Sequence, residues 1–202
     1  MLILNTGLRV GEASAIKLSD IDFYERTLKI ERSLFYNPQK GALENGTKFR
    51  FQNPKYNSKR IIPLNDTAYE AVVNQMKVRN SPYKNLPEEF KDLLFLNRRG
   101  RPLDQRSINH NISVIVNRIN INNPDIEFKR FGIHVLRHTF ATNCIDLGME
   151  PNKLKTILGH ANITVTLNNY VKQIITKYDT AILDELYETF FAEEPDYPVA
   201  CS

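Results

Sequence analysis

Residues 134–142 read His-Val-Leu-Arg-His-Thr-Phe-Ala-Thr, and the first five form the densest polar cluster of an otherwise apolar stretch. On a helix, His134, Arg137 and His138 share one face. If all three were charged they would repel one another, and a phosphate over that face would relieve the repulsion because Arg suits two phosphate oxygens. Zinc is the competing ligand, but Arg137 between the histidines and the lack of a carboxylate nearby in sequence argue against it. Taken alone, the cluster leaves a phosphate site and a pair of interior histidines equally open.

Two further segments favour the phosphate site. Residues 6–12 read TGLRVGE and place Arg9 in a helix-like apolar run. Arginine is rarely buried unless it is paired, so Arg9 needs a ligand or a partner such as Glu12. The second segment, residues 158–164, reads LGHANIT and is followed by Tyr170, ten positions after its histidine.

Together the segments TGLRVGE, HVLRHTFAT and LGHANITVTLNNY, in this order, resemble the phage-integrase family of tyrosine recombinases. The similarity runs from about residue 3 to about residue 175, nearly the whole chain. It implies a catalytic-domain fold that is mostly α with a small antiparallel β-sheet, in the α+β class. It also implies a DNA strand breaking and rejoining enzyme that uses neither a metal nor another cofactor.

The resemblance assigns a role to each motif residue. Tyr170 would attack a DNA phosphodiester and form a 3′-phosphotyrosyl link, which a 5′-hydroxyl of another strand then reseals. Arg9 and Arg137 would clamp the non-bridging phosphate oxygens, where fixed cations stabilise the developing charge. His160 would hydrogen-bond the phosphate, and His134 would act as acid or base near the tyrosine hydroxyl.

The resemblance also implies supporting residues and a general acid. Glu12 would orient its neighbours, and His138 would have a supporting role within the fold. A lysine on the β-hairpin after the second strand would protonate the leaving 5′-oxygen, and Lys55 is the natural choice in residues 53–64. This hairpin is one residue shorter than in typical relatives and carries Tyr where Thr is common. The alternatives Lys59 and Lys48 therefore stay open.

The charge distribution suits a polyanionic partner, although charge alone favours an unevenly charged, solvated surface. The chain has 27 Lys and Arg against 23 Asp and Glu, but seven of the acids follow position 178 and no cation does, so residues 1–178 carry +11. Double-stranded DNA is the expected partner, and basic residues outside the motifs are candidates for its backbone. The strongest candidates are Lys17, Arg60, Arg98, Arg99, Lys129 and Arg130.

Local patterns predict a helix over residues 1–17, interrupted by glycines, and then about three strands in one small antiparallel sheet. Further helices are expected up to position 191. The expected strands cover residues 27–31, 48–51 and 60–63. The expected helices cover about 66–80, 104–119 with a start at either 104 or 107, 132–147, 151–158, 164–170 and 174–191.

Composition limits the remaining possibilities. With 42% hydrophobic and 25% charged residues over 202 positions, the chain suits one globular domain. No run approaches ~20 apolar residues, so no membrane span is expected. Cys144 and Cys201 form no CxxC pair, which favours a reducing, cytoplasmic setting.

We therefore expect residues 1–178 to form the catalytic domain and residues 179–202 an acidic C-terminal helix and tail. The N-terminal core-binding domain that accompanies this family would be absent from the chain. A homo-tetramer on DNA is expected of the full-length protein, acting in integration or excision of a mobile element or phage. DNA relaxation of the type IB topoisomerase kind and a non-catalytic DNA-binding fragment remain alternative functions.

Overall fold

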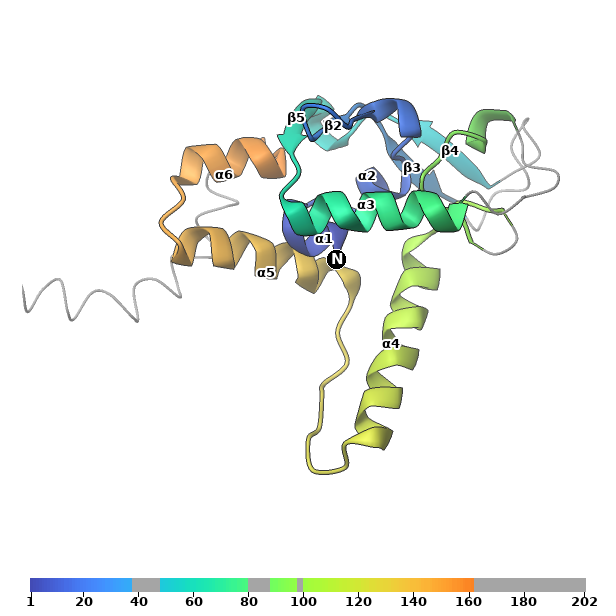
Figure 1. The fold of residues 1–202 in the computed structure, drawn as a ribbon, viewed down its shortest axis with the longest axis vertical. Coiled ribbons are helices and arrows are strands. Elements are labelled where there is room, and N and C mark those ends of the chain that lie inside the picture. Colours follow the sequence, from blue (N-terminus) through green and yellow to red (C-terminus); the bar gives the residue numbers. More distant parts are fainter. Residues whose placement is uncertain (38–47, 80–87, 98–99, 162–202) are drawn as a thin grey trace, which may run out of the picture. The chain divides into compact units, whose positions relative to one another are not determined.

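The structure is a computed structural model that describes residues 1–37, 48–79, 88–97 and 100–161 (Figure 1). These residues combine six α-helices, three short 3₁₀ helices and five strands, which agrees with the expected mostly α, α+β class. The helices are α1 (Leu2–Thr6), α2 (Val10–Ser14), η1 (Leu18–Asp20), η2 (Lys55–Asn57), α3 (Asp66–Arg79), η3 (Glu88–Phe90), α4 (Gln105–Asn122), α5 (Ile133–Asp146) and α6 (Pro151–Leu158). The strands are β1 (Ile21–Asp22), β2 (Thr27–Ile30), β3 (Ser33–Tyr36), β4 (Phe49–Gln52) and β5 (Arg60–Pro63).

The strands form two antiparallel sheets in this part of the chain, where the sequence predicted one. The first sheet has the order β1-β2-β5, and the second pairs β3 with β4. The predicted strand at 48–51 therefore belongs to a different sheet from the other two. Its partner is β3, in which Leu34 lies opposite Phe51. The sequence patterns did not predict strand β3.

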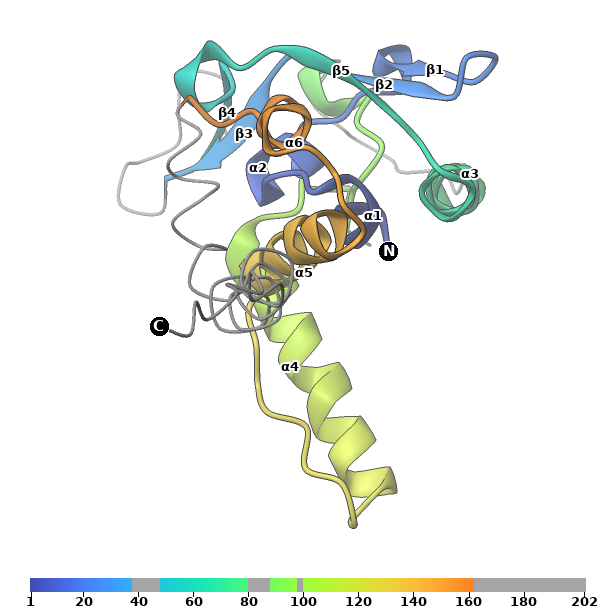
Figure 2. The same ribbon diagram turned by 90° about the vertical axis from the view of Figure 1, so that its left-hand side faces the viewer.

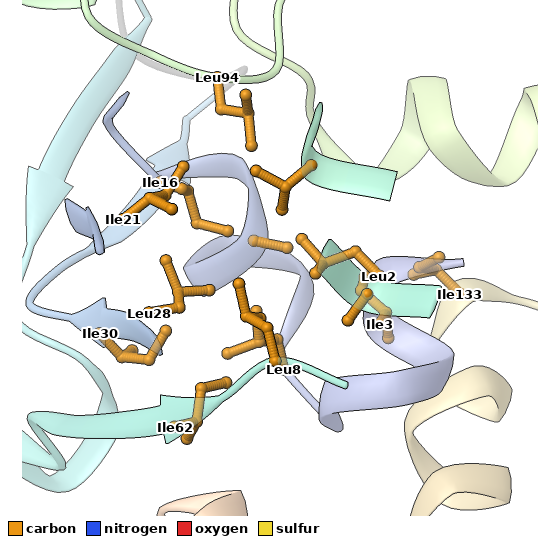
Figure 3. Packing of buried hydrophobic residues seen from close by; sticks show 14 residues of the cluster. Leu2, Ile3, Leu8, Ile16, Ile21, Leu28, Ile30, Ile62, Leu94 and Ile133 are labelled. Carbon is orange, nitrogen blue, oxygen red and sulfur yellow. The ribbon is translucent and has the colours of Figure 1, made fainter. Parts of the chain in front are cut away.

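The main core lies between the first two helices and the inner face of the three-stranded sheet (Figure 3). Alternation along the strands puts Leu28, Ile30 and Ile62 on this face, where each is at most 2% exposed. Leu8 from the α1–α2 junction fills the centre and is completely buried. Burial of such side chains contributes about 1.5–3 kcal/mol each.

The predicted N-terminal helix is two short helices. Gly7 ends α1 with a left-handed φ of 64°, and α2 begins after Arg9. A Cβ on Gly7 would come within 2.4 Å of the Phe140 ring and 2.7 Å of Leu158, so glycine is also required by the close approach of α5 and α6. The break brings the N-cap residue Arg9 next to the end of α6, where its guanidinium contacts the carbonyl of Gly159.

The C-terminal helices of the described part pack against one another and against the sheet. Helix α5 contacts α1 and α6, and α6 contacts β5 (Figure 2). Pro151 occupies the first turn of α6, as predicted, and Gly159 ends the helix with φ 64°. The C-terminal end of α6 therefore lies beside the first residues of β5.

Helix α4 begins at the first of its two predicted starts, after Asp104. The side chain of Asp104 accepts hydrogen bonds from the backbone of Arg106 and Ser107, at 2.8 and 3.1 Å. The predicted apolar face of α4 is only partly covered, since Val116 is buried whereas Ile115 is 58% exposed. None of the helices in the described ranges has the length and apolarity needed to cross a membrane. The helices expected over 164–170 and 174–191 lie outside the described residues.

Candidate active site

A buried carboxylate organises the candidate site. Glu12 in α2 is 1% exposed and accepts from two arginines. Its Oε1 lies 2.8 Å from Arg9 Nη1 and 3.2 Å from Arg60 Nη1, and its Oε2 lies 2.9 Å from Arg60 Nη2. Oε2 also accepts from the backbone N–H of Arg9 at 3.0 Å, so the carboxylate caps its own helix.

The ionisation of Glu12 follows from these contacts. Burial on its own would raise the Glu12 pKa, but hydrogen bonds and positive charge from Arg60 and then Arg9 outweigh it and hold the pKa below its ordinary value. The carboxylate is therefore negatively charged at neutral pH. A charged Glu12 fixes both guanidinium groups through charge-assisted hydrogen bonds.

The C-terminal end of α6 is the second organising feature. Three consecutive carbonyls there each accept from a different arginine: Ile157 O from Arg60 Nε at 2.6 Å, Leu158 O from Arg137 Nη2 at 2.8 Å, and Gly159 O from Arg9 Nη2 at 2.8 Å. The last carbonyls of a helix lack intrahelical donors and carry partial negative charge, so they are suited to cations. The helix end thus gathers guanidinium groups from β5, α5 and the start of α2.

Arg137 connects this end to α1 and to His160. Its Nη1 donates to Gly7 O at 2.6 Å, and its Nη2 lies 2.8 Å from His160 Nε2 as well as from Leu158 O. Since Arg137 is always a donor, we assign His160 the tautomer with the proton on Nδ1. Arg137 is 9% exposed, and these contacts supply the partners that a buried arginine requires.

His160 is held neutral by its surroundings. Burial first, then the positive charges of Arg137, Arg9 and Arg60, lower the His160 pKa to about 4, and the charge of Glu12 offsets only part of this. The ring is therefore a neutral hydrogen-bonding group at pH 7.

A histidine-selective NMR titration is expected to place the His160 midpoint near pH 4, with the signal assigned by its loss in His160→Gln. Because the folded state binds fewer protons than the unfolded state between about pH 4 and 6.5, this residue makes the free energy of unfolding rise with pH over that window. A midpoint at or above 6.5 would contradict the observed packing of the ring against Arg137.

Gly159 is required where Arg60 crosses the end of α6. A Cβ on Gly159 would come within 2.7 Å of Arg60 Nη1 and 2.8 Å of Ser58 Oγ, and its φ of 64° disfavours other residues. The glycine of the LGH segment thus permits the close approach of an arginine.

Gly159→Ala is expected to lower the free energy of unfolding by more than the ~1–2 kcal/mol of a left-handed residue alone, because it also displaces Arg60. Gly148→Ala is the matched control, since Gly148 has φ 80° but a Cβ added there would meet nothing within 4 Å in the described part of the chain. Thermal and chemical unfolding of both variants measures the difference. Equal losses would show that Arg60 does not pack tightly against Gly159.

An open groove of about 760 Å³ runs beside the clustered arginines, and its walls include Arg9, Lys55 and His134. Lys55 is exposed in η2, a turn in which Tyr56 has a left-handed φ of 63°. His134 is exposed in the first turn of α5. Arg106, at the start of α4, adds another cation to the groove wall.

The structure brings together most of the predicted motif residues, but the three polar residues of the α5 cluster differ in burial. Arg137 points into the protein, whereas His134 and His138 on the same helix are exposed. In the described ranges no group of three or more His, Cys, Asp and Glu side chains is placed to hold a metal ion. Tyr170 lies outside the described residues.

The predicted DNA-backbone residues occupy different environments. Lys129 and Arg130 are exposed in the connection between α4 and α5, and Lys17 is half-buried with its Nζ 5.4 Å from the centre of the Phe51 ring. Arg98 and Arg99 lie outside the described residues.

Arg60 was predicted to contact the DNA backbone, but its side chain is buried in the structure. Its side chain is only 6% exposed, and its guanidinium is occupied by Glu12 and by backbone carbonyls. The sequence carried a signal for this position, because residues two apart in a strand share a face and Arg60 precedes the buried Ile62 by two. Its opposite residue in β2 is the buried Ile30.

The model of the phage integrase family matches residues 1–175. The chain belongs to the phage integrase family. Among its relatives in this family, the transposase from transposon Tn916 of Enterococcus faecalis is 33% identical over 171 residues, covering 84% of this chain and 40% of the transposase. Tyrosine recombinase XerC of Bacillus subtilis is 28% identical over 186 residues, covering 92% of this chain and 50% of the recombinase.

Solved structures of the family agree with the fold. The integrase of transposon Tn1549, solved in complex with transposon right end DNA, superposes with a TM-score of 0.75 at 28% identity, covering 95% of this chain and 57% of that one. Its complex with a circular intermediate DNA gives a TM-score of 0.72 at 30% identity, with 84% and 52% covered. This phage integrase chain therefore spans about half the length of the relatives that it matches.

Proposed function

We propose that the chain is the catalytic part of a site-specific DNA recombinase that integrates or excises a mobile element. Its substrate is double-stranded DNA, and the full-length protein acts as a homo-tetramer on two duplexes. The DNA-bound integrase of Tn1549 and the Tn916 transposase support this proposal by their similarity to the chain.

In the proposed reaction the Tyr170 oxygen attacks the scissile phosphorus, and the bond from phosphorus to the 5′-oxygen breaks. His134 accepts the tyrosine proton, and Lys55 donates a proton to the leaving 5′-oxygen. Attack by a 5′-hydroxyl of another strand then reverses these transfers and frees the tyrosine. A tyrosine of ordinary pKa about 10 needs such a base and a positive surrounding to react at neutral pH.

The scissile phosphate lies, in this proposal, against Arg9, Arg137 and His160. The observation that carries the proposal is the gathering of these side chains at the end of α6, next to the groove that Lys55 and His134 line. Guanidinium groups that are already fixed stabilise a developing negative charge without reorganising. They supply electrostatic stabilisation of the kind that metal ions give in other phosphoryl-transfer enzymes.

A strand-transfer assay with two DNA duplexes tests this function. One duplex carries the candidate cleavage point with a nick just beyond it, and the other ends in a labelled 5′-hydroxyl strand. A joined product that spans both duplexes is expected. Relaxation of supercoiled plasmid without joined product would indicate a topoisomerase of the type IB kind, and a gel shift without cleavage by the full-length protein would indicate a DNA-binding function instead.

A further inference from the structure

Arg60 lies where three parts of the candidate site meet. It starts β5, and its guanidinium contacts Glu12 in α2, Ile157 O at the end of α6 and Ser58 O in the turn after η2. The Ser58 contact is 3.0 Å, and the Ser58 hydroxyl in turn donates to Lys55 O at 2.9 Å. One side chain thus joins the carboxylate, the helix end and the lysine-bearing turn.

The contacts of Arg60 set the orientation of the Glu12 carboxylate. Both carboxylate oxygens accept from Arg60, through Nη1 to Oε1 and Nη2 to Oε2. Such a two-point contact fixes the plane of a carboxylate, which a single bond does not. The oxygen Oε1 is shared with Arg9 Nη1, so the position of Oε1 decides where the Arg9 guanidinium lies.

The contact of Arg60 with the end of α6 also constrains the position of Arg9. Arg60 holds Ile157 O, and Arg9 holds Gly159 O two residues later. Arg60 therefore fixes both anchors of Arg9, the carboxylate on one side and the helix end on the other. Hydrogen bonding and charge from Arg60 also contribute more than those from Arg9 to lowering the Glu12 pKa against the effect of burial.

We infer that Arg60 is a positioning residue that orients Arg9 for the scissile phosphate through Glu12 and the end of α6. This inference rests on the proposed function for its effect on DNA cleavage. It replaces the expectation that Arg60 contacts the DNA backbone directly. The two roles differ in what they do to DNA affinity.

Arg60→Lys separates these roles because it keeps the charge but loses the two-point contact with Glu12. Arg26→Lys is the matched control, since Arg26 is half-exposed and pairs with Asp66 in a surface contact of 2.6 Å. The measurements are the dissociation constant for DNA over a range of salt concentrations and the single-turnover rate constant and amplitude of cleavage at saturating DNA. The exchange of the Arg9 guanidinium protons with water, followed by ¹⁵N NMR in the absence of DNA, is a readout that does not need activity.

Arg60→Lys is expected to cleave bound DNA about 10²-fold more slowly, the size of effect that a misplacement of ~1 Å produces. The salt dependence of binding should stay as in the wild type, and the Arg9 protons should exchange faster. Arg26→Lys should change none of these quantities.

Two results would overturn the inference. Weaker binding with a salt slope reduced by about 0.9, at an unchanged cleavage rate constant, would make Arg60 a phosphate contact. A lower amplitude with an unchanged rate constant would also overturn the inference, because Arg60 would then affect only the folded fraction of the protein. If the wild type forms no covalent product at all, the proposed function fails. The exchange of the Arg9 guanidinium protons with water then tests the positioning role separately. Unchanged exchange in Arg60→Lys overturns that role, and faster exchange supports it.

Discussion

Arg137→Lys is expected to slow DNA cleavage by about 10²–10³-fold, the range seen when one fixed donor to a developing oxyanion is removed. A lysine keeps the positive charge, but its single ammonium cannot reach Gly7 O, Leu158 O and the His160 ring together, as the two guanidinium nitrogens of Arg137 do. The phosphate would lose a fixed two-point partner, and His160 would lose the donor that sets its tautomer. Single-turnover cleavage at saturating DNA measures the loss.

The control for Arg137→Lys is Arg79→Lys. Arg79 also donates from a partly buried position to a backbone carbonyl, Leu93 O at 2.6 Å, but it lies at the end of α3 outside the candidate site. Both substitutions should lower the free energy of unfolding, since each leaves a carbonyl with a poorer partner. Only Arg137→Lys should lower the cleavage rate constant. Equal cleavage by both variants would contradict the place of Arg137 in the phosphate site.

Glu12→Gln is expected to lower the free energy of unfolding by about 3–5 kcal/mol at pH 7, the cost of removing one partner from a buried ion pair. The variant leaves the guanidinium groups of Arg9 and Arg60 beside a neutral amide that cannot accept at both positions. Chemical unfolding at pH 7 measures the loss. The cleavage rate constant should fall as well, because Arg9 loses its anchor.

The loss in Glu12→Gln should depend on pH in a defined direction. The folded Glu12 pKa lies below the ordinary value of 4.5, so the stabilisation by the charged form is complete above 4.5 and is lost as pH falls through the folded pKa. The difference between wild type and variant should therefore narrow in acid. Asp20→Asn is the control, since Asp20 is a second buried carboxylate paired with an arginine, Arg32. It should cost stability without slowing cleavage, and equal slowing by both variants would contradict a specific role for Glu12.

The sequence was sufficient for the features that depend on local spacing. Asp104 and Pro151 begin helices as predicted, because capping and first-turn preferences act within a few residues. The pairing of Arg9 with Glu12 at i+3 was likewise foreseeable from its spacing. The family resemblance supplied the grouping of Arg9 with Arg137 and His160, which are far apart in sequence.

Features that depend on long-range packing were not predictable in the same way. The β3–β4 pair forms a sheet of its own because Phe49 packs with Phe90 in a second core cluster. No local sequence pattern predicts that Phe49 contacts Phe90. The alternation of β5 placed Arg60 on the same face as Ile62, but it did not identify the partner of its guanidinium. Arg60 and Glu12 are 48 positions apart in sequence, so local spacing could not predict their ion pair.

The most direct test of the central claim is to identify the residue that carries DNA in the covalent product. Wild-type protein is incubated with the nicked duplex, the product is digested with protease and nuclease, and the phosphorylated peptide is sequenced by mass spectrometry, with Tyr170→Phe in parallel. We expect a nucleotide 3′-phosphate on Tyr170 and no covalent product from the variant. A 3′-phosphate on a different residue, or a product that persists in Tyr170→Phe, would contradict it.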